Sequence, residues 1–396
     1  MIPFIDLQAQ QAVIKDKITQ GINKVLSHGQ YILGPEVAEL EQQLADYCQV
    51  KHAISCASGT DALVLALYAQ QVKPGDVIIT TPFSFIATAE AIALVGAIPL
   101  FCDVNPMDFN LDETLLEPLI SDFYGNQTQL PRLLQQQLSV NSRIAGVIPV
   151  DLFGLPCNYQ QINQIAKQYD LIVIADAAQS FGSSINNQKV GAFADITTTS
   201  FFPAKPLGCY GDGGAVFTNH DELATIAHSI RVHGQGVTPY EHTHIGINSR
   251  LDTLQAAILL AKLSIFEQEL QQRQTIAAHY QQAFQKIGLT TQIINTSPTI
   301  LKQSAWAQFT VQANNNNHRS AICSALKAQQ IPYNIYYPIP LHLQPAFQYL
   351  GYQPGAMPVA EQLCHTLFSI PMHPYLGKTT INKVIKVIAS TNDNYK

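Results

Sequence analysis

Short apolar or β-branched runs alternate with helical segments over much of this chain, and this alternation most constrains its fold. We expect strands at residues 52–56, 77–80, 98–104, 144–150, 171–175, 196–200 and 215–218. Helical spacing fills two of the intervals, at residues 60–70 and 84–95. Strands that alternate with helices predict an α/β fold, in which a mostly parallel central sheet carries helices on both faces. In such sheets, ligands bind at the carboxyl ends of the strands.

Helical spacing also extends to either side of this region. Pro35 fits the first turn of a helix whose apolar face holds Val37, Leu40, Leu44 and Tyr47. A long helical stretch begins at residue 251, and we expect a second helix over residues 277–284. Further on, we expect strands at 305–311 and 333–337, a turn at 314–317, a helix at 319–329 and two final helices.

We therefore expect two domains. Residues 1–250 would form a large domain with an N-terminal helical arm, and residues 251–396 would form connecting helices and a small C-terminal α+β domain. Residues 121–142 are rich in Gln, Asn and Ser, which predicts a surface insertion with a short helix near 133–138.

The composition excludes several classes of protein. The net charge is −6 and no Lys/Arg cluster stands out, so we expect no nucleic-acid partner. No apolar run reaches the roughly 18 residues of a membrane span, and the first residues lack the features of a signal peptide. The seven cysteines are widely spaced without a Cys-x-x-Cys motif, which predicts free buried thiols and no metal site. We expect a cytoplasmic protein.

Two residues indicate the chemistry. Asp176 follows the apolar run 171–175, and a buried carboxylate is costly unless it is paired. Lys205 lies in a loop framed by Pro203, Pro206 and Gly208, where a lysine buried in a site can acquire a lowered pKa. An acid at a strand end and a downstream lysine suit pyridoxal 5′-phosphate, because the lysine can form a Schiff base and the acid can hold the pyridine nitrogen protonated. The alternative for Asp176 is a carboxylate held by backbone amides.

Other motifs fit the same cofactor. Ser58-Gly59-Thr60-Asp61 lies between a strand and a helix, where backbone N–H groups favour a phosphate, although an ordinary helix cap is the alternative. Phe85 opens the next helix and can stack on a flat ring, or it can belong to the core. Gln179 can reach the ring hydroxyl, and Ser200 can contact the phosphate.

Substrate contacts are less distinctive. Arg250 follows Asn248-Ser249 and can clamp a carboxylate or phosphate, or it can be a surface arginine at a helix start. The segment Tyr336–His342 is aromatic and stiffened by prolines, so Tyr336, Tyr337 and His342 can line a sugar or base site or simply pack.

Taken together, these motifs resemble the DegT/StrS-like nucleotide-sugar aminotransferases, which have the fold type I architecture of the aspartate aminotransferase superfamily. The resemblance covers nearly the full length, through residues 4–7, 29–36, 58–63, 85–90, 175–180, 200–205, 211–215, 248–252 and 337–344. It implies a PLP-dependent transaminase, because relatives that dehydrate sugars have histidine where this chain has Lys205.

The resemblance also implies a role for each matching residue. Lys205 matches the Schiff-base lysine and Asp176 the acid on the pyridine nitrogen. The remaining cofactor residues would be Gly59, Thr60 and Ser200 on the phosphate, Phe85 on the ring and Gln179 near the phenolic oxygen. Asn248 matches an asparagine that a neighbouring subunit supplies to the phosphate, which implies a homodimer with shared active sites. Tyr31, Arg250, Tyr336, Tyr337 and His342 would bind substrate.

Within the family, residues 199–214 and 250–260 are most similar to aminotransferases that act on UDP-2-acetamido-2-deoxy-3-oxo-glucuronate. This implies transfer of an amino group from L-glutamate to a keto group of a nucleotide-activated sugar, for surface polysaccharide biosynthesis. Tyr336 and Asp151 differ from the residues usual in relatives, and we expect both to face the substrate. The alternatives are a 4-keto-6-deoxy sugar aminotransferase, a PLP-dependent sugar dehydratase and a non-catalytic regulator.

Overall fold

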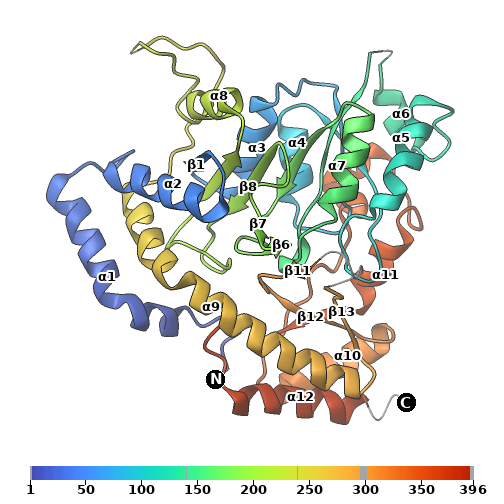
Figure 1. The fold of residues 1–396 in the computed structure, drawn as a ribbon. Helices are drawn as coiled ribbons and strands as arrows, with labels where there is room; N and C mark the ends of the chain where they lie inside the picture. The colour runs from blue at the N-terminus through green and yellow to red at the C-terminus, as the bar shows by residue number, and fades with distance from the viewer. Residues whose placement is uncertain (1, 140, 239, 295–300, 393–396) are drawn as a thin grey trace.

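The central feature of the fold is a seven-stranded sheet with the strand order β1-β9-β8-β5-β4-β2-β3 (Figure 1). The structure is a computed structural model that describes residues 2–139, 141–238, 240–294 and 301–392. The strands are β1 (His52–Cys56), β2 (Val77–Thr80), β3 (Ile98–Phe101), β4 (Ile144–Ile148), β5 (Ile172–Asp176), β8 (Ile196–Ser200) and β9 (Gly214–Thr218). Neighbours from β8 to β3 are parallel, and β9 runs antiparallel to both β1 and β8. The expected mostly parallel sheet is confirmed.

Helices cover both faces of this sheet because successive side chains of a strand point to opposite sides. Ile78 and Ile174 pack in the core beneath α3 (Gly59–Ala69), α4 (Ala87–Leu94) and α8 (Asp221–Arg231). Val77 and Val173 pack on the other face, beneath α5 (Leu116–Tyr124) and α7 (Tyr159–Gln168). Both faces are buried, which explains why most residues of these strands are apolar or β-branched.

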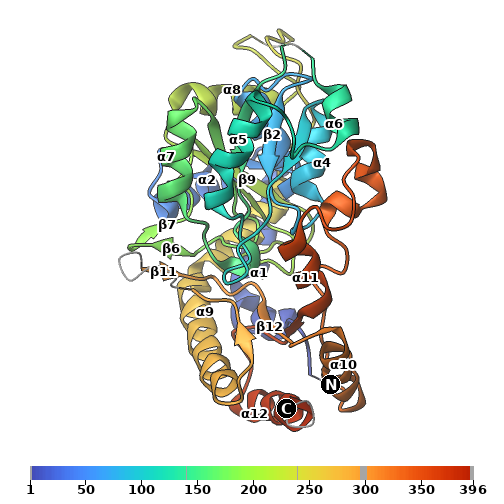
Figure 2. The same cartoon turned by 90° about the vertical axis from the view of Figure 1, so that its right-hand side faces the viewer.

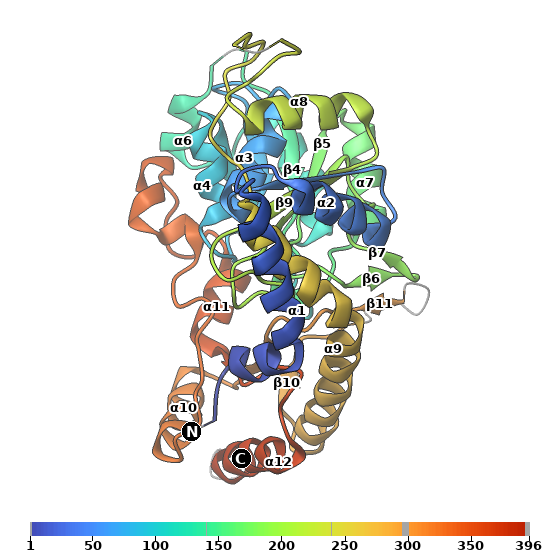
Figure 3. The same ribbon diagram turned by 90° about the vertical axis from the view of Figure 1, so that its left-hand side faces the viewer.

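Two long helices flank the β1–β9 end of the sheet. Helix α9 (Thr253–Lys286) packs with α2 (Pro35–Cys48) on Ala53, Phe217 and their neighbours. Helix α1 (Leu7–His28) lies along α9 (Figure 3), where Ile14 and Ile18 contact Ile258 and Ala261. The side-chain amide of Gln10 on α1 also donates hydrogen bonds to both oxygens of the buried Glu269 carboxylate, at 3.0 and 2.9 Å.

The C-terminal part has a core of its own below the main sheet (Figure 2). An antiparallel sheet of β10 (Thr290–Thr291), β12 (Phe309–Gln312) and β13 (Leu367–Ile370) packs with the end of α9 and with α10 (Asn316–Ala328) and α12 (Lys378–Asn392). Ile2 joins this core from the N-terminus. The division of the chain near residue 250 stays a prediction.

Three expectations about secondary structure were wrong. Residues 253–286 form one helix of 34 residues instead of two, because no glycine or proline interrupts the segment and its middle is buried against both cores. Residues 333–337 form no strand, since prolines flank them and only Asn334 pairs, with Ser369. Strand β12 pairs instead with β13, in the region where we expected only helices.

Smaller elements complete the description. In the predicted insertion at 121–142, α5 extends to Tyr124 and the expected short helix is α6 (Arg132–Gln137). A third small sheet combines β6 (Ser184–Ile185), β7 (Gln188–Lys189) and β11 (Lys302–Gln303). Helix α11 (Pro358–Thr366) precedes β13. All seven cysteines are buried as free thiols, and no helix in the described ranges is long and apolar enough to cross a membrane.

Candidate functional site

A cavity of about 550 Å³ opens at the carboxyl ends of β5 and β8, beside the first turns of α3 and α4. The sheet topology brings these ends together, because β5 and β8 are adjacent and parallel. Nine of the thirteen residues expected in a site line this cavity: Gly59, Thr60, Phe85, Asp176, Gln179, Ser200, Lys205, Tyr336 and Tyr337. Residues from both ends of the chain also reach it.

Asp176 is the last residue of β5 and is 5% exposed. Its Oδ2 atom accepts a hydrogen bond from the Thr88 hydroxyl at 2.6 Å, and its Oδ1 atom accepts from the Ala178 N–H at 3.1 Å. Burial raises the pKa of Asp176, whereas these two bonds and the charge of Lys205 oppose the shift. The carboxyl group is thus oriented by two donors beside a cavity in which a cationic partner would stabilise its charged form.

Lys205 lies in the loop that joins β8 to β9. Its backbone N–H donates to the Phe202 carbonyl at 2.9 Å, which closes a turn and directs the side chain into the cavity. Burial lowers the pKa of Lys205, and the charge of Asp176 opposes that shift. A lysine with a lowered pKa spends more time as a free amine, which is the form able to attack a carbonyl or accept a proton.

The start of α3 forms one wall. Ser58 caps the helix by accepting the Asp61 N–H at 3.0 Å, and Gly59 and Thr60 follow at the cavity. A Cβ atom on Gly59 would lie 2.6 Å from the Cβ atom of Ser200, so only glycine fits at this approach of helix to strand. Free N–H groups at a helix start, two hydroxyls and a backbone without a side chain make a cradle that fits a phosphate.

Aromatic rings form the opposite side. Phe85 is 57% exposed although it lines the cavity, and its ring lies 6.4 Å from that of Tyr337. The Tyr337 hydroxyl accepts a bond from Gln179 at 3.3 Å, and Gln179 in turn accepts the Phe153 N–H at 2.8 Å. Burial raises the pKa of Tyr337, so its hydroxyl stays protonated at neutral pH. An uncovered ring beside a fixed amide suits a flat, polar-edged ligand.

Four expected residues lie elsewhere. Tyr31 is 48% exposed on the loop between α1 and α2, and Asn248 is exposed on the loop before α9. Arg250 does not line the cavity, and its Nε atom is buried without a hydrogen-bond partner in the described part of the chain. His342 is 1% exposed, bonds to Glu361 at 3.0 Å and packs on Phe101, so within this chain its side chain belongs to the core.

The expectation that residue 151 faces the substrate was wrong. Asp151 is fully buried behind the site, where it accepts bonds from the Tyr159 hydroxyl at 2.8 Å, the Ser180 hydroxyl at 2.7 Å and the Cys157 N–H at 2.8 Å. Burial raises the pKa of Asp151 to about 6, and these donors oppose the shift. Its side chain does not line the cavity.

The sequence analysis missed several residues of the cavity. Thr88 lies within the segment 85–90, but only the fold shows that its hydroxyl reaches Asp176. Ile5, Phe202 and Gln308 line the cavity without any local motif that marks them. In the described ranges, no group of three or more His, Cys, Asp or Glu side chains could hold a metal ion.

Comparison with known proteins agrees with this geometry. Residues 12–389 match the model of the DegT/DnrJ/EryC1/StrS aminotransferase family. A UDP-2-acetamido-2-deoxy-3-oxo-D-glucuronate aminotransferase from Pseudomonas aeruginosa is 46% identical over 390 residues, covering 98% of this chain and 100% of its own. Among solved structures, an aminotransferase from Brucella abortus described by the same family name shares 44% identity and a TM-score of 0.90, covering 98% of this chain and 99% of its own. DesV of S. venezuelae, solved in complex with a ketimine intermediate, shares 31% identity and a TM-score of 0.88, covering 99% and 98%.

Proposed function

The chain belongs to the DegT/DnrJ/EryC1/StrS aminotransferase family, and from this premise we propose that the 550 Å³ cavity is a transaminase active site. The reaction moves an amino group from L-glutamate to a keto group of a nucleotide-activated sugar. The observation that carries the proposal is the meeting of Asp176 and Lys205 in one cavity, where burial shifts both pKa values toward the neutral forms.

The cofactor is pyridoxal 5′-phosphate, which when bound withdraws electrons from the carbon atom that loses a proton. The cavity fits this group. Gly59, Thr60 and Ser200 would hold the phosphate, since any side chain at Gly59 would fill the cradle. Asp176 would hold the ring nitrogen protonated, and a cationic nitrogen would stabilise its buried charge. Phe85 would cover one face of the ring.

Lys205 performs the proton transfer. It would hold the cofactor through its Nζ atom until the amino donor arrives. The released amine then takes a proton from the Cα atom of L-glutamate, because burial leaves a larger share of it uncharged than for a surface lysine. In the second half of the reaction, the same Nζ atom delivers a proton to the sugar carbon that receives the amino group. The hydrogen bond from Gln179 to Tyr337 holds these two polar side chains in place at the cavity during both halves of the reaction.

Lys205→Ala tests this assignment directly. The variant loses turnover and also the visible absorbance of lysine-bound cofactor. Borohydride reduction of the holoenzyme followed by peptide mapping marks Lys205 in the wild type. Label at another lysine would contradict the assignment, and a protein that stays colourless with added cofactor would favour a non-catalytic regulator.

The proposed sugar is a UDP-2-acetamido-3-keto uronate, used for surface polysaccharide biosynthesis. The support is the 46% identity to the Pseudomonas aeruginosa aminotransferase that is named for this substrate. Turnover of 3-keto and 4-keto nucleotide sugars with L-glutamate as donor separates this proposal from a 4-keto-6-deoxy sugar aminotransferase. Preference for the 4-keto sugar would overturn it.

The active site would be shared within a homodimer. Lys205 is the only lysine or arginine among the described residues that line the cavity, although the cofactor and the substrate are both anionic. A second copy would supply Asn248, which is exposed on the loop before α9, and Arg250 two residues later would bring positive charge to the same region. Just before Arg250, the side chains of Val237, Tyr240 and Ile245 are at least 91% exposed, as expected of an unpaired interface.

Subunit mixing tests the shared site. Asn248→Ala and Lys205→Ala would each be inactive alone if both residues serve every site. After equal mixing and exchange, roughly a quarter of the sites regain both residues, because half of the dimers are mixed and each mixed dimer has one intact site. No recovered turnover, with exchange verified by mass spectrometry, would show that each chain completes its own site.

A further inference from the structure

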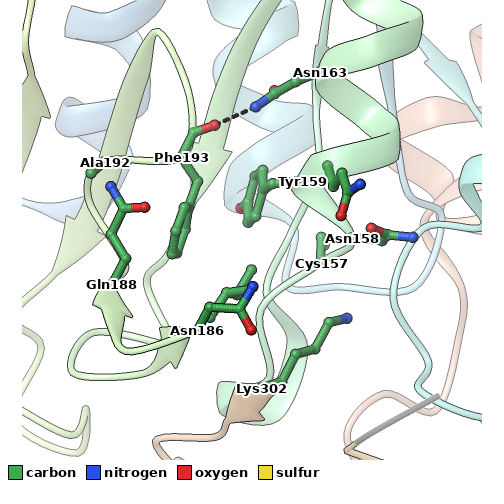
Figure 4. A pocket seen from close by; sticks show the side chains of 11 residues that line it. Cys157, Asn158, Tyr159, Asn163, Asn186, Gln188, Ala192, Phe193 and Lys302 are labelled. Atoms are coloured by element: carbon green, nitrogen blue, oxygen red, sulfur yellow. Dashed lines mark hydrogen bonds between the residues drawn. The ribbon is translucent and has the colours of Figure 1, made fainter. Parts of the chain in front are cut away.

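A second cavity lies on the α7 side of the molecule, apart from the active site. Its volume is about 340 Å³, and it opens between α7, the β6–β7 hairpin and β11 (Figure 4). The two cavities share no lining residue. The volume is near the lower end of the range of about 300–1,000 Å³ for small-molecule sites, which suits a molecule of monosaccharide size.

The floor of this cavity is buried and rigid. Cys157 is fully buried and Tyr159 is 2% exposed. The backbone N–H of Cys157 and the hydroxyl of Tyr159 both donate to the same oxygen of Asp151, each at 2.8 Å. The Tyr159 ring stacks on Phe193 at 5.6 Å, and Figure 4 shows the two rings side by side. A floor fixed in this way needs little reorganisation when a ligand binds.

Lys302 supplies a positive charge to this floor. It is 8% exposed, and Figure 4 shows its side chain extending from β11 beneath Asn158. Asp108 attracts Lys302 and has a pKa that burial raises to about 6, but Asp108 does not line the cavity. Among the described residues that line it, none is acidic and Lys302 is the only cation.

Amide side chains form the rest of the polar lining: Asn158, Gln160, Asn163, Asn186 and Gln188. Their bonds leave free groups. Asn158 donates to Glu113 at 2.6 Å, yet its Oδ1 atom is buried without a partner in the described chain. Asn163 donates one N–H to the Phe193 carbonyl. Asn186 accepts the Leu301 N–H through its Oδ1 atom, and its NH₂ group has no hydrogen-bond partner among the described residues.

We propose that this second cavity is an accessory binding site for a small hydroxylated carboxylate, such as a free sugar acid. Together the amides present both donors and acceptors, which matches the dual character of a hydroxyl group. Asp108 attracts Lys302 from outside the cavity, and the ammonium can also donate to a ligand carboxylate because it has three N–H donors. The stacked rings of Tyr159 and Phe193 form an apolar wall, against which the C–H groups on one face of a sugar ring can pack.

Binding is tested on the cofactor-loaded protein with D-glucuronate as the probe. Saturation-transfer NMR or calorimetry compares it with D-glucose, which lacks the charge, and with acetate, which lacks the hydroxyls. We expect a dissociation constant of about 1 mM or lower for D-glucuronate, and binding at least about tenfold weaker for the other two.

Variants locate the binding. Lys302→Gln removes the charge. Gln188→Trp, at the exposed first position of β7, fills the opening and serves as a second variant in case loss of the buried lysine impairs folding. Lys167→Gln on the exposed side of α7 is the matched control. We expect both cavity variants to weaken D-glucuronate at least about tenfold and the control to leave it unchanged. Equal binding by D-glucose, no saturable binding, or equal affinity in Gln188→Trp and wild type would overturn the proposal.

Discussion

Gly59→Ala probes the approach between α3 and β8 on which the proposed phosphate cradle depends. The added Cβ atom would lie 2.6 Å from the Cβ atom of Ser200, 3.0 Å from its Oγ and 3.2 Å from its Cα. Ser200 cannot move away easily, because it pairs with Gly214 in the sheet. Gly214 is itself packed against the start of α3, since a Cβ atom on Gly214 would lie 2.3 Å from the Ser58 carbonyl oxygen. The start of α3 must therefore move away from the strand.

The expected cost follows from this overpacking. Forced insertion of a methyl group into a filled interior costs about 1–3 kcal/mol, so the thermal midpoint of the apo protein should fall by roughly 1–4 °C for a chain of this length. Displacement of the helix start also removes charge-assisted bonds to the phosphate, which should weaken cofactor binding about 10- to 100-fold. Differential scanning fluorimetry measures the first effect, and titration of the apo protein with pyridoxal phosphate measures the second.

Two further variants separate sterics from binding. Gly377→Ala is the matched control, because a Cβ atom there would have no heavy atom within 4 Å. The double variant Gly59→Ala/Ser200→Gly removes the two closest contacts and leaves only the 3.2 Å approach to the Cα atom, but it also removes one proposed phosphate donor. It should therefore regain part of the lost stability without regaining full cofactor affinity. If Gly59→Ala matched the control in both measurements, the close approach would have no role in binding.

Three other perturbations have defined outcomes. Thr88→Val removes the 2.6 Å hydrogen bond to Asp176, so the pKa of that carboxyl should rise. In a plot of kcat against pH, the acidic limb should then move to higher pH, whereas Thr88→Ser should retain the wild-type profile. Burial and the charge of Arg273 lower the pKa of His373 to about 4 from an unfolded value of about 6.5. The unfolded chain binds this proton first, so stability is lost as pH falls from about 6.5 to 4, by up to roughly 3 kcal/mol, and His373→Leu should flatten that part of the urea-unfolding profile. Phe85→Leu should raise the dissociation constant of the cofactor about tenfold while the apo midpoint stays within about 1 °C, and an equal loss of apo stability would instead assign the ring to the core.

The sheet could be predicted closely because its signals are local. Strands β1, β2 and β8 begin and end at the predicted residues, since each is an unbroken run buried on both faces. The long helix α9 was misread because its middle carries charged residues that look exposed in sequence. Glu269 and Arg273 are in fact 4% and 5% exposed, and they are held by partners on α1 and on the C-terminal part.

The candidate site could be predicted where backbone geometry restricts the residue type. Gly59 is required by a close approach, and Lys205 lies in a turn framed by prolines and glycine, so both leave a signature in adjacent residues. His342 leaves none. Its burial depends on Phe101 and Glu361, which lie 241 and 19 residues away and meet it only in the fold. The second cavity is equally non-local, because Lys302 and Asn158 come from distant parts of the chain.

Asp151 and Asp176 show how neighbours decide the role of one sequence signal. Each follows an apolar run in the sequence and each is buried. The Asp151 N–H donates a backbone hydrogen bond of 3.0 Å to the Asp176 carbonyl. The carboxylate of Asp151 is surrounded by donors from this chain, including Tyr159, so it has no room for a ligand. That of Asp176 has one side chain donor, Thr88, and one backbone donor, and it lines a cavity. A buried acid with fewer donors from its own chain needs an external cation to stay charged, so this difference in hydrogen bonding supports the proposal that Asp176, and not Asp151, binds a ligand.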